Sequence, residues 1–244
     1  MALLSSSPPT TDAERRALVS HASRDELARF LRTTPPDRLL SLSEQAILAM
    51  GTYSYVMAKR ERVRGVLLEE QVIHVLAKEH PFATRLEYEA GPNQGRIVIF
   101  NSAASADQFR VHEGGLLSFA GPLWFPVDSV MAKADSNHTI KEAGLGNLVS
   151  RLRRELKKAT ALGGMEVTDE GWNEAGHYCQ LHVMPGSGKG FDYAKSRVCM
   201  DLSAGIPTKV ESYDANGALI ERYVFSDLKP ARVADTAFDP AQPF

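Results

Sequence analysis

From Tyr53 onward the chain alternates apolar and polar residues and carries turn residues at the spacing of β-hairpins. Turn signals stand at Gly65, His80-Pro81, Gly91-Pro92 and Gly114-Gly115, and again at Asp214-Ala215-Asn216-Gly217. Strands joined by such short turns are antiparallel, because parallel neighbours need a crossover of about a dozen residues or more. The pattern therefore predicts an antiparallel meander.

We expect strands at about 53–63, 67–79, 82–90, 95–101, 107–112 and 116–119, and at about 165–169, 175–184, 193–202, 207–213 and 219–228. About eleven antiparallel strands cannot stay flat, because strand twist accumulates across a sheet. The prediction is an α+β fold built on a large curved antiparallel sheet, an open half-barrel whose concave face is covered by helices.

Three helices are expected. The first runs from Asp12 to Leu31 and ends before Pro35-Pro36, and the second runs from about Pro36 to Met50. The third, of about 15 residues around Leu145 to Leu156, has leucines on one face. We expect its basic residues to be solvated, namely Arg151, Arg153, Arg154, Lys157 and Lys158.

The predicted organisation is a flexible N-terminal segment, residues 1–11, followed by one domain, residues 12–244. Residues 12–50 form its helical part and residues 53–240 the half-barrel. Ser, Pro and Thr make up residues 5–11, a linker composition without core residues. The first residues have too little apolar content for a complete signal peptide.

Charge and hydropathy exclude two classes of partner. Lysine and arginine number 28 against 30 acidic residues, so the basic excess typical of nucleic-acid binding is missing. The longest nearly apolar run, Leu116 to Val127, has about a dozen residues and contains two prolines, whereas a membrane span needs about 20. We therefore expect no nucleic acid and no transmembrane segment.

Two glycine motifs resemble nucleotide loops but lack their defining residues. Pro185 to Gly190 has neither the first glycine nor the Ser or Thr of a P-loop, and we interpret it as a hairpin turn. Gly144-Leu145-Gly146-Asn147 lacks a third glycine and a preceding parallel strand, and we interpret it as the entry into a helix. No serine occupies a nucleophile elbow either. The sequence predicts a non-enzymatic protein without a cofactor.

His177, Cys179, His182 and Cys199 fall on two strands that can pair. A zinc site is one reading, but strand alternation turns His182 away from His177 and Cys179. A second reading is two free thiols. The third is a disulfide, because a hairpin centred on Lys189 places the two cysteines directly opposite each other, at a Cα separation of about 4.4–6.8 Å.

Lys59-Arg60-Glu61-Arg62 is a charged quartet inside a strand, and Glu69-Glu70 fall on its hairpin partner. Cross-strand pairs of Arg60 with Glu70, or of Arg62 with Glu69, would explain it. A polar rim around an opening is the functional alternative.

The apolar segment from Leu116 to Val127 is broken by proline and has to cover part of the core. One reading is a loop that seals the core, and the other is a mobile lid over an apolar cavity. On the second reading the candidate ligand-binding residues at the cavity mouth are Leu116, Leu117, Phe119, Leu123, Trp124 and Phe125.

Several short blocks, in this order, resemble a bacterial family known as domain of unknown function 1571. The blocks are Tyr55, Lys59-Arg60-Glu61-Arg62-Val63, Pro81-Phe82, Gly95-Arg96, Gly144 to Leu148, Pro207 to Asp214, and Phe238-Asp239-Pro240. This family is similar in architecture to the lipoprotein-localisation carriers of the bacterial periplasm, which are antiparallel half-barrels closed by helices.

The resemblance implies an exported, periplasmic protein, and an oxidising compartment strengthens the expectation of a disulfide. It also implies that the cavity binds or carries a lipid, an acyl chain, a lipoprotein or another apolar ligand. The alternative is an envelope interaction or scaffold protein with a filled core and no ligand. Folds host unrelated activities, so the resemblance transfers no catalytic residue.

Overall fold

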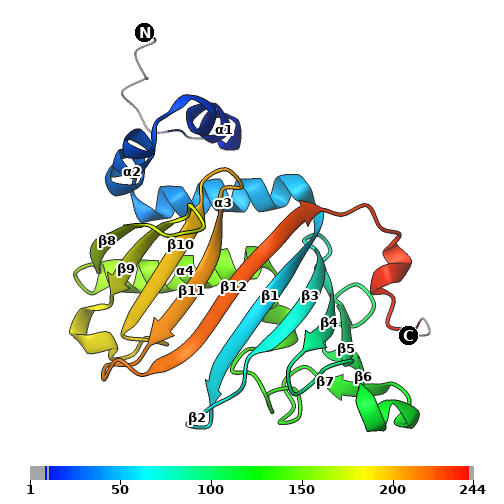
Figure 1. Ribbon diagram of the computed structural model, residues 1–244. Coiled ribbons are helices and arrows are strands. Elements are labelled where there is room, and N and C mark those ends of the chain that lie inside the picture. The colour runs from blue at the N-terminus through cyan, green and yellow to red at the C-terminus, as the bar shows by residue number, and fades with distance from the viewer. Residues whose placement is uncertain (1–8, 10, 242–244) are drawn as a thin grey trace.

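The computed structural model describes residue 9 and residues 11–241, apart from the side chains of Leu117, Ser118 and Ala120. In this part of the chain, twelve strands form one antiparallel sheet in the order β7-β6-β5-β4-β3-β1-β12-β11-β10-β9-β8, with β2 paired to β1 (Figure 1). The strands are β1 (Thr52–Val63), β2 (Val66–Leu67), β3 (Gln71–Lys78), β4 (Ala83–Ala90), β5 (Ile97–Asn101), β6 (Gln108–His112), β7 (Leu123–Pro126), β8 (Glu166–Trp172), β9 (Tyr178–Val183), β10 (Lys195–Asp201), β11 (Ile206–Tyr213) and β12 (Leu219–Pro230).

The sheet consists of two meanders joined along their first and last strands. β1 pairs with β12 from Tyr53↔Pro230 to Glu61↔Glu221 and with β3 on its other edge. The predicted α+β class with a large curved antiparallel sheet is therefore confirmed, with twelve described strands where we expected about eleven.

The helices are α1 (Asp12–His21), α2 (Arg24–Thr33), α3 (Pro36–Met50) and α4 (Leu145–Ala161), with short 3₁₀ turns η1 (Gly115–Ala120), η2 (Ile140–Glu142), η3 (Pro185–Gly188) and η4 (Asp235–Phe238). α3 and α4 lie together on one face of the sheet, and α1 and α2 lie beyond its upper edge (Figure 1). The main core forms where Ile47 of α3 and Leu145, Leu148 and Val149 of α4 pack on the inner side chains of the strands.

The prediction of one helix from Asp12 to Leu31 is wrong, because two capping boxes divide the segment. Thr11 caps α1 together with Glu14, and Ser23 caps α2 together with Glu26. A side-chain oxygen that satisfies the first free backbone N–H groups starts a new helix at Ser23. α3 matches its predicted bounds.

Two strand predictions and the side-chain pairs built on one of them differ from the structure. Residues 116–119 belong to the turn η1 instead of a strand, and β7 follows at Leu123. The expected strand 67–79 is divided into β2 and β3, since residues 68–70 leave the ladder. As a result, the predicted pairs Arg60–Glu70 and Arg62–Glu69 do not form. Arg60 Nε donates to the Leu68 carbonyl, Arg62 Nε donates to the Leu219 carbonyl, and Glu70 pairs with Arg222.

The C-terminal segment covers the other face of the sheet over β3 and β4. Phe238 is 1% exposed and packs against Leu76 and Ala83, and Asn101 Nδ2 donates to its carbonyl oxygen. This contact gives the Phe238-Asp239-Pro240 block a structural role, because it buries the outward side chains of two strands.

Candidate functional site

A cavity of about 340 Å³ lies between the inner face of the sheet and the first turns of α4. Its apolar wall comes from inward-facing side chains of β1, β3, β4, β5, β6, β7 and β12, namely Tyr55, Met57, Ile73, Leu86, Tyr88, Val98, Phe109, Val111, Phe125, Tyr223 and Phe225. Residues 127–144, which we call the strap, connect β7 to α4 and close the remaining side. Met131 of the strap lines the cavity and is 66% exposed, so the cavity reaches the surface there.

The cavity has a polar end, and Glu61 is its most buried group, at 1% exposure. Oε1 of Glu61 accepts from Ser136 Oγ at 2.9 Å and from the Tyr223 hydroxyl at 2.7 Å, and Oε2 accepts from the Asn137 backbone N–H at 2.6 Å. A buried carboxylate needs such partners to offset its loss of hydration. Two of the three donors belong to the strap, so Glu61 holds the strap to β1.

Lys59 lies beside Glu61 and is 7% exposed. Its Nζ is 3.3 Å from Glu61 Oε1 and 3.2 Å from the Asp135 carbonyl oxygen, to which it donates. Burial by itself would lower the pKa of Lys59, but Glu61, Tyr88 and Asp135 outweigh it and the pKa is raised. The ammonium therefore stays charged inside the cavity.

Glu221 is the second buried carboxylate, at 3% exposure. Arg151 NH1 lies 3.0 Å from its Oε1, His138 Nε2 lies 2.7 Å from its Oε2, and Ser212 Oγ donates at 2.9 Å. Burial alone would raise the pKa of Glu221, but the charges of Arg151 and His138 hold it at about 2. The expectation that Arg151 is solvated is wrong, because this residue faces the sheet from α4 and is 8% exposed.

His138 belongs to the strap, and its Nε2 lies 2.7 Å from Glu221 Oε2 and 2.6 Å from Arg151 NH1. Burial would lower its pKa, but hydrogen bonds to Glu142 and Glu221 outweigh burial and raise the pKa to about 9. Arg96 of the sheet pairs with Asp135 of the strap at 2.8 Å and with Glu113 at 2.9 Å. The strap is thus fixed to the sheet by ion pairs at both Asp135 and His138.

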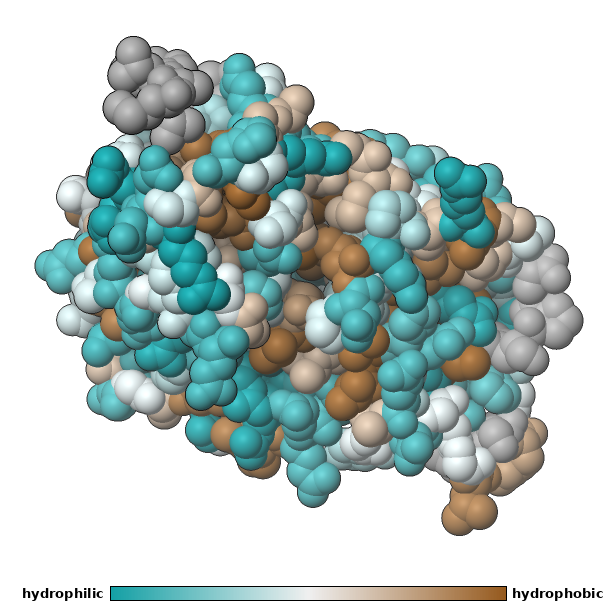
Figure 2. Space-filling view, turned by 45° about the horizontal axis from the view of Figure 1, so that its top comes forward, coloured by the Kyte–Doolittle hydropathy of each residue, from teal (hydrophilic) through white to brown (hydrophobic). Residues whose placement is uncertain are grey.

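The six residues predicted at the cavity mouth lie in different environments in the structure. Phe125 lines the cavity and packs against Phe109, with ring centroids 5.9 Å apart. Its neighbour Trp124 points to the other face of β7 and is 49% exposed. Leu116, Phe119 and Leu123 are exposed by 91%, 86% and 45%, and the side chain of Leu117 lies outside the described residues. Figure 2 shows hydrophobic side chains projecting at this end of the molecule. Their role in ligand binding stays a prediction.

A polar rim around an opening was the alternative interpretation of the charged quartet, and two of its residues, Lys59 and Glu61, lie at the polar end of the cavity. The alternation of β1 carries the signal: Tyr53, Tyr55 and Met57 point inward, and the same period places Lys59 and Glu61 on the inner face. Charged residues that continue an apolar face indicate a polar pocket. Glu221 on β12 carries the same signal, because Tyr223 and Phe225 continue its inward face, whereas His138 on the strap has none.

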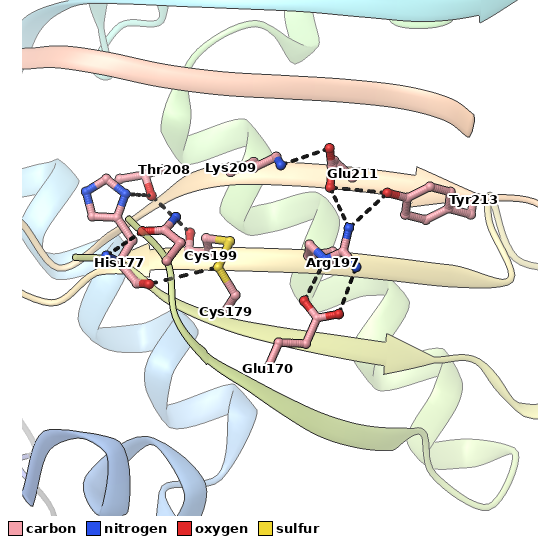
Figure 3. The surroundings of a disulfide bond; sticks show 10 residues. Glu170, His177, Cys179, Arg197, Cys199, Thr208, Lys209, Glu211 and Tyr213 are labelled. Atoms are coloured by element: carbon pink, nitrogen blue, oxygen red, sulfur yellow. Dashed lines mark hydrogen bonds and ion pairs between the residues drawn. A yellow bond between two sulfur atoms is a disulfide. The ribbon is translucent and has the colours of Figure 1, made fainter. Parts of the chain in front are cut away.

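The predicted disulfide between Cys179 and Cys199 is present (Figure 3). It joins β9 and β10, which lie in the half of the sheet that does not line the cavity. The two cysteines are directly paired between β9 and β10, as the hairpin register predicts, but their Cα separation of 4.0 Å is shorter than expected. The bond excludes the zinc and free-thiol readings. Beside it, His177 Nδ1 is 2.9 Å from Thr208 Oγ1, and Arg197 pairs with Glu170 and Glu211.

Among the residues that the structure describes, every helix is too short or too polar to span a lipid bilayer.

Solved structures with a similar chain path have low sequence identity to this protein. An uncharacterised conserved protein from Thermus thermophilus aligns with a TM-score of 0.48 and 10% identity, over 83% of this chain and 91% of that one. A putative outer membrane lipoprotein-sorting protein domain from Vibrio parahaemolyticus gives 0.42 and 13%, over 82% and 94%. The lipoprotein LppX of Mycobacterium tuberculosis gives 0.45 and 12%, over 82% and 100%.

A comparison with curated proteins gives no match. The family model described as "Protein of unknown function (DUF1571)" matches residues 50–244, which include the whole sheet, the strap and α4. These are the elements that build the cavity and its polar end. The chain belongs to this family.

Proposed function

We propose that this protein binds and carries a lipid, an acyl chain or another apolar ligand in the cavity between the sheet and α4. The observation that carries the proposal is the cavity itself: about 340 Å³, with a mainly aliphatic and aromatic wall. This volume lies within the range of roughly 300–1,000 Å³ found for ligand sites. The alternative, an envelope scaffold with a filled core, requires this space to be packed with side chains.

The charged groups of the cavity support a binding role over a catalytic one. Glu61 and Glu221 are each held by several short hydrogen bonds or ion pairs, and these contacts fix the strap in place. The pKa of Glu221 is held at about 2 by Arg151 and His138, so its carboxylate is a weak general base near neutral pH. We therefore assign these residues to the architecture of the cavity.

Export to the periplasm or another oxidising compartment forms part of the proposal. Structural disulfides persist in such compartments and are rare in a reducing cytosol. The Cys179–Cys199 bond supports this placement. The proposal also treats residues 12–244 as one domain, since Leu27 and Leu31 of α2 pack against Tyr178 and Leu202 of the half-barrel.

The direct test is organic extraction and mass spectrometry of the protein purified from the periplasm. We expect a lipid in near-stoichiometric amount, and after its removal saturable binding of a fluorescent fatty acid. If no lipid co-purifies and no saturable binding is found, the scaffold alternative is supported instead.

A variant that fills the cavity makes the test specific. Met57→Trp adds a large ring at the cavity wall and is expected to weaken the binding of the fatty acid about tenfold or more. Val66→Trp is the matched control, because Val66 is 63% exposed on the short strand β2, outside the cavity wall. Equal affinities of the two variants would contradict binding in this cavity.

A further inference from the structure

The carboxylates at the polar end of the cavity are held by donors other than Lys59. Glu61 has the three short hydrogen bonds described above. Asp135 Oδ2 accepts from Asn93 Nδ2 at 2.6 Å and from Arg96 NH1 at 2.8 Å, and Glu113 accepts from Arg96 Nε at 2.9 Å. Arg96 and Arg151 thus each form an ion pair with a carboxylate at 3.0 Å or less.

Lys59 differs from the other cations of the cavity. Its two contacts, to Glu61 and to the Asp135 carbonyl, are 3.3 and 3.2 Å long. An ammonium group has three protons to donate, so the described contacts leave one of them for another acceptor. Because Lys59 lines the cavity and is 7% exposed, that acceptor has to come from within the cavity.

The position of Lys59 on β1 places it at the end of an apolar track. Tyr55 and Met57 precede it on the same inner face, and both line the cavity. Ile73 of β3 pairs with Met57 across the ladder and lines the cavity as well. An extended apolar chain along this track would bring its polar end to the ammonium.

We propose that the ligand is an amphiphile with one anionic headgroup, and that the Lys59 ammonium binds an oxygen of that headgroup. This inference rests on the proposed function and names its ligand class. Neutral donors and the strap backbone already stabilise Glu61, so the lysine charge is available to a second anion. An ammonium bonded to a carboxylate or phosphate oxygen in a dry site forms a strong, charge-assisted hydrogen bond.

The charge of Lys59 and the charge of such a ligand coexist over a wide pH range. The neighbouring acidic groups raise the pKa of Lys59, which keeps it protonated well above neutral pH. A carboxylate or phosphate headgroup is ionised at about pH 8. The contact is therefore between two charged groups at that pH.

The test compares amphiphiles that share one chain and differ only in the headgroup. Delipidated protein is loaded with the uncharged dye Nile red at about pH 8, and displacement is measured with palmitate, hexadecyl phosphate, hexadecanol and hexadecylamine. We expect the better of the two anions to bind about tenfold more tightly than hexadecanol, and hexadecylamine to bind most weakly. The relative affinities of palmitate and hexadecyl phosphate distinguish a carboxylate headgroup from a phosphate.

Three variants assign the preference to Lys59. Lys59→Met should reduce the ratio of anion to alcohol affinity to near one, and Lys59→Arg should retain the ratio. Lys209→Met is the matched control, because Lys209 is an ion-paired lysine of the same sheet, bonded to Glu211 at 2.9 Å (Figure 3), and does not line the cavity. Its ratio should equal that of the wild type.

The outcomes separate this inference from the proposed function. Hexadecanol binding equal to that of both anions, or tightest binding of hexadecylamine, would overturn the anionic headgroup and leave the apolar cavity intact. Failure of all four compounds to displace the dye would overturn the proposed function itself. The wild-type ratios decide the headgroup even if Lys59→Met does not fold.

Discussion

Two halves of one sheet are covered in different ways, and the apolar cavity with the charged end lies in only one of them. Over β8 to β11, helices α2 and α3 present leucine and phenylalanine side chains that pack against Tyr178 and Leu202, and the gap beneath them is about 50 Å³, while a mostly polar hollow of about 580 Å³ lies at the turns around Gly164 and Gly186. Over β1 and β3 to β7, the cover is the first part of α4 and the strap, and the gap is about 340 Å³. An apolar helix face fills the space beneath it, whereas a strap fixed by ion pairs leaves it open.

The two halves also differ in what joins their elements. The filled half contains the covalent bond between Cys179 and Cys199 on adjacent strands. The cavity half is held by Glu61, Glu221 and their partners on α4 and the strap. We expect a change in the filled half to alter stability alone, and a change in the cavity half to alter stability or ligand binding.

The largest effect is expected from Arg151→Leu. Removing this guanidinium leaves Glu221 buried without its main counter-charge, which costs about 3–5 kcal/mol of unfolding free energy. Urea denaturation measures the loss. Arg153→Leu is the control, since Arg153 pairs with Glu44 near the surface and its loss should cost about 1 kcal/mol or less. Equal losses would show that the buried network does not hold the cavity half together.

Replacing both cysteines by serine tests the filled half. In the chain-entropy model, opening a loop with a sequence separation of 20 lowers the unfolding free energy by about 3 kcal/mol. Ligand affinity should stay unchanged, because the bond lies outside the cavity wall. Reduction of the wild-type disulfide should lower the unfolding free energy by the same amount and leave the ligand affinity unchanged. Two free thiols in freshly purified periplasmic protein would contradict the prediction.

Phe125→Ala and Trp124→Ala sharpen the comparison within a single strand. Phe125 lines the cavity, so its truncation should weaken the binding of an acyl ligand by about 1–3 kcal/mol. Trp124 points away and is half-exposed, so its truncation should change the affinity by less than about 0.5 kcal/mol. Isothermal titration with one fatty acid measures both. A larger loss for Trp124→Ala would place the ligand on the outer side of β7.

The smallest effect concerns pH. The pKa of His138 is raised from its ordinary 6.5 to about 9 in the folded protein. The group therefore adds stability that is fully present below about pH 6.5 and is lost as the pH rises through 9. The pKa difference alone corresponds to about 3 kcal/mol, but the His138 side chain is 21% exposed and water screens part of its interactions. We therefore expect a decline of about 1–2 kcal/mol over this range, measured by urea denaturation at several pH values. His138→Gln should remove this part of the pH dependence, and an unchanged profile would assign it to other groups.

The sheet and the disulfide could be predicted from the sequence, because both depend on patterns between residues that are close in the chain. Alternation and turn residues determine the strands, and the hairpin centre at Lys189 brings Cys179 opposite Cys199. The break between α1 and α2 was readable too, since Ser23 and Glu26 have the spacing of a capping box. The first prediction gave more weight to the apolar spacing than to the cap.

The polar end of the cavity depends on contacts that the sequence does not encode locally. Glu61 and Ser136 meet although 75 positions separate them, and His138 and Glu221 are separated by 83. The strap has no regular period, so its path over the sheet follows from these ion pairs and from the length of chain between β7 and α4. Lys59, Glu61 and Glu221 could be predicted from the sequence, through the inward faces of β1 and β12.

The start of α4 is fastened to the start of β1. The Tyr53 hydroxyl accepts from the Leu145 backbone N–H at 2.9 Å and donates to Glu79 Oε1 at 2.5 Å, and Gly146 lies so close to Glu79 that a Cβ there would stand 2.3 Å from its Oε2. These contacts set the spacing between α4 and the sheet at one end of the cavity. Under the proposed function, a ligand longer than the cavity would extend toward the strap, whose polar contacts can exchange with water. The fixed spacing at the start of α4 would then limit the thickness of the ligand at that end, and the strap would accommodate differences in its length.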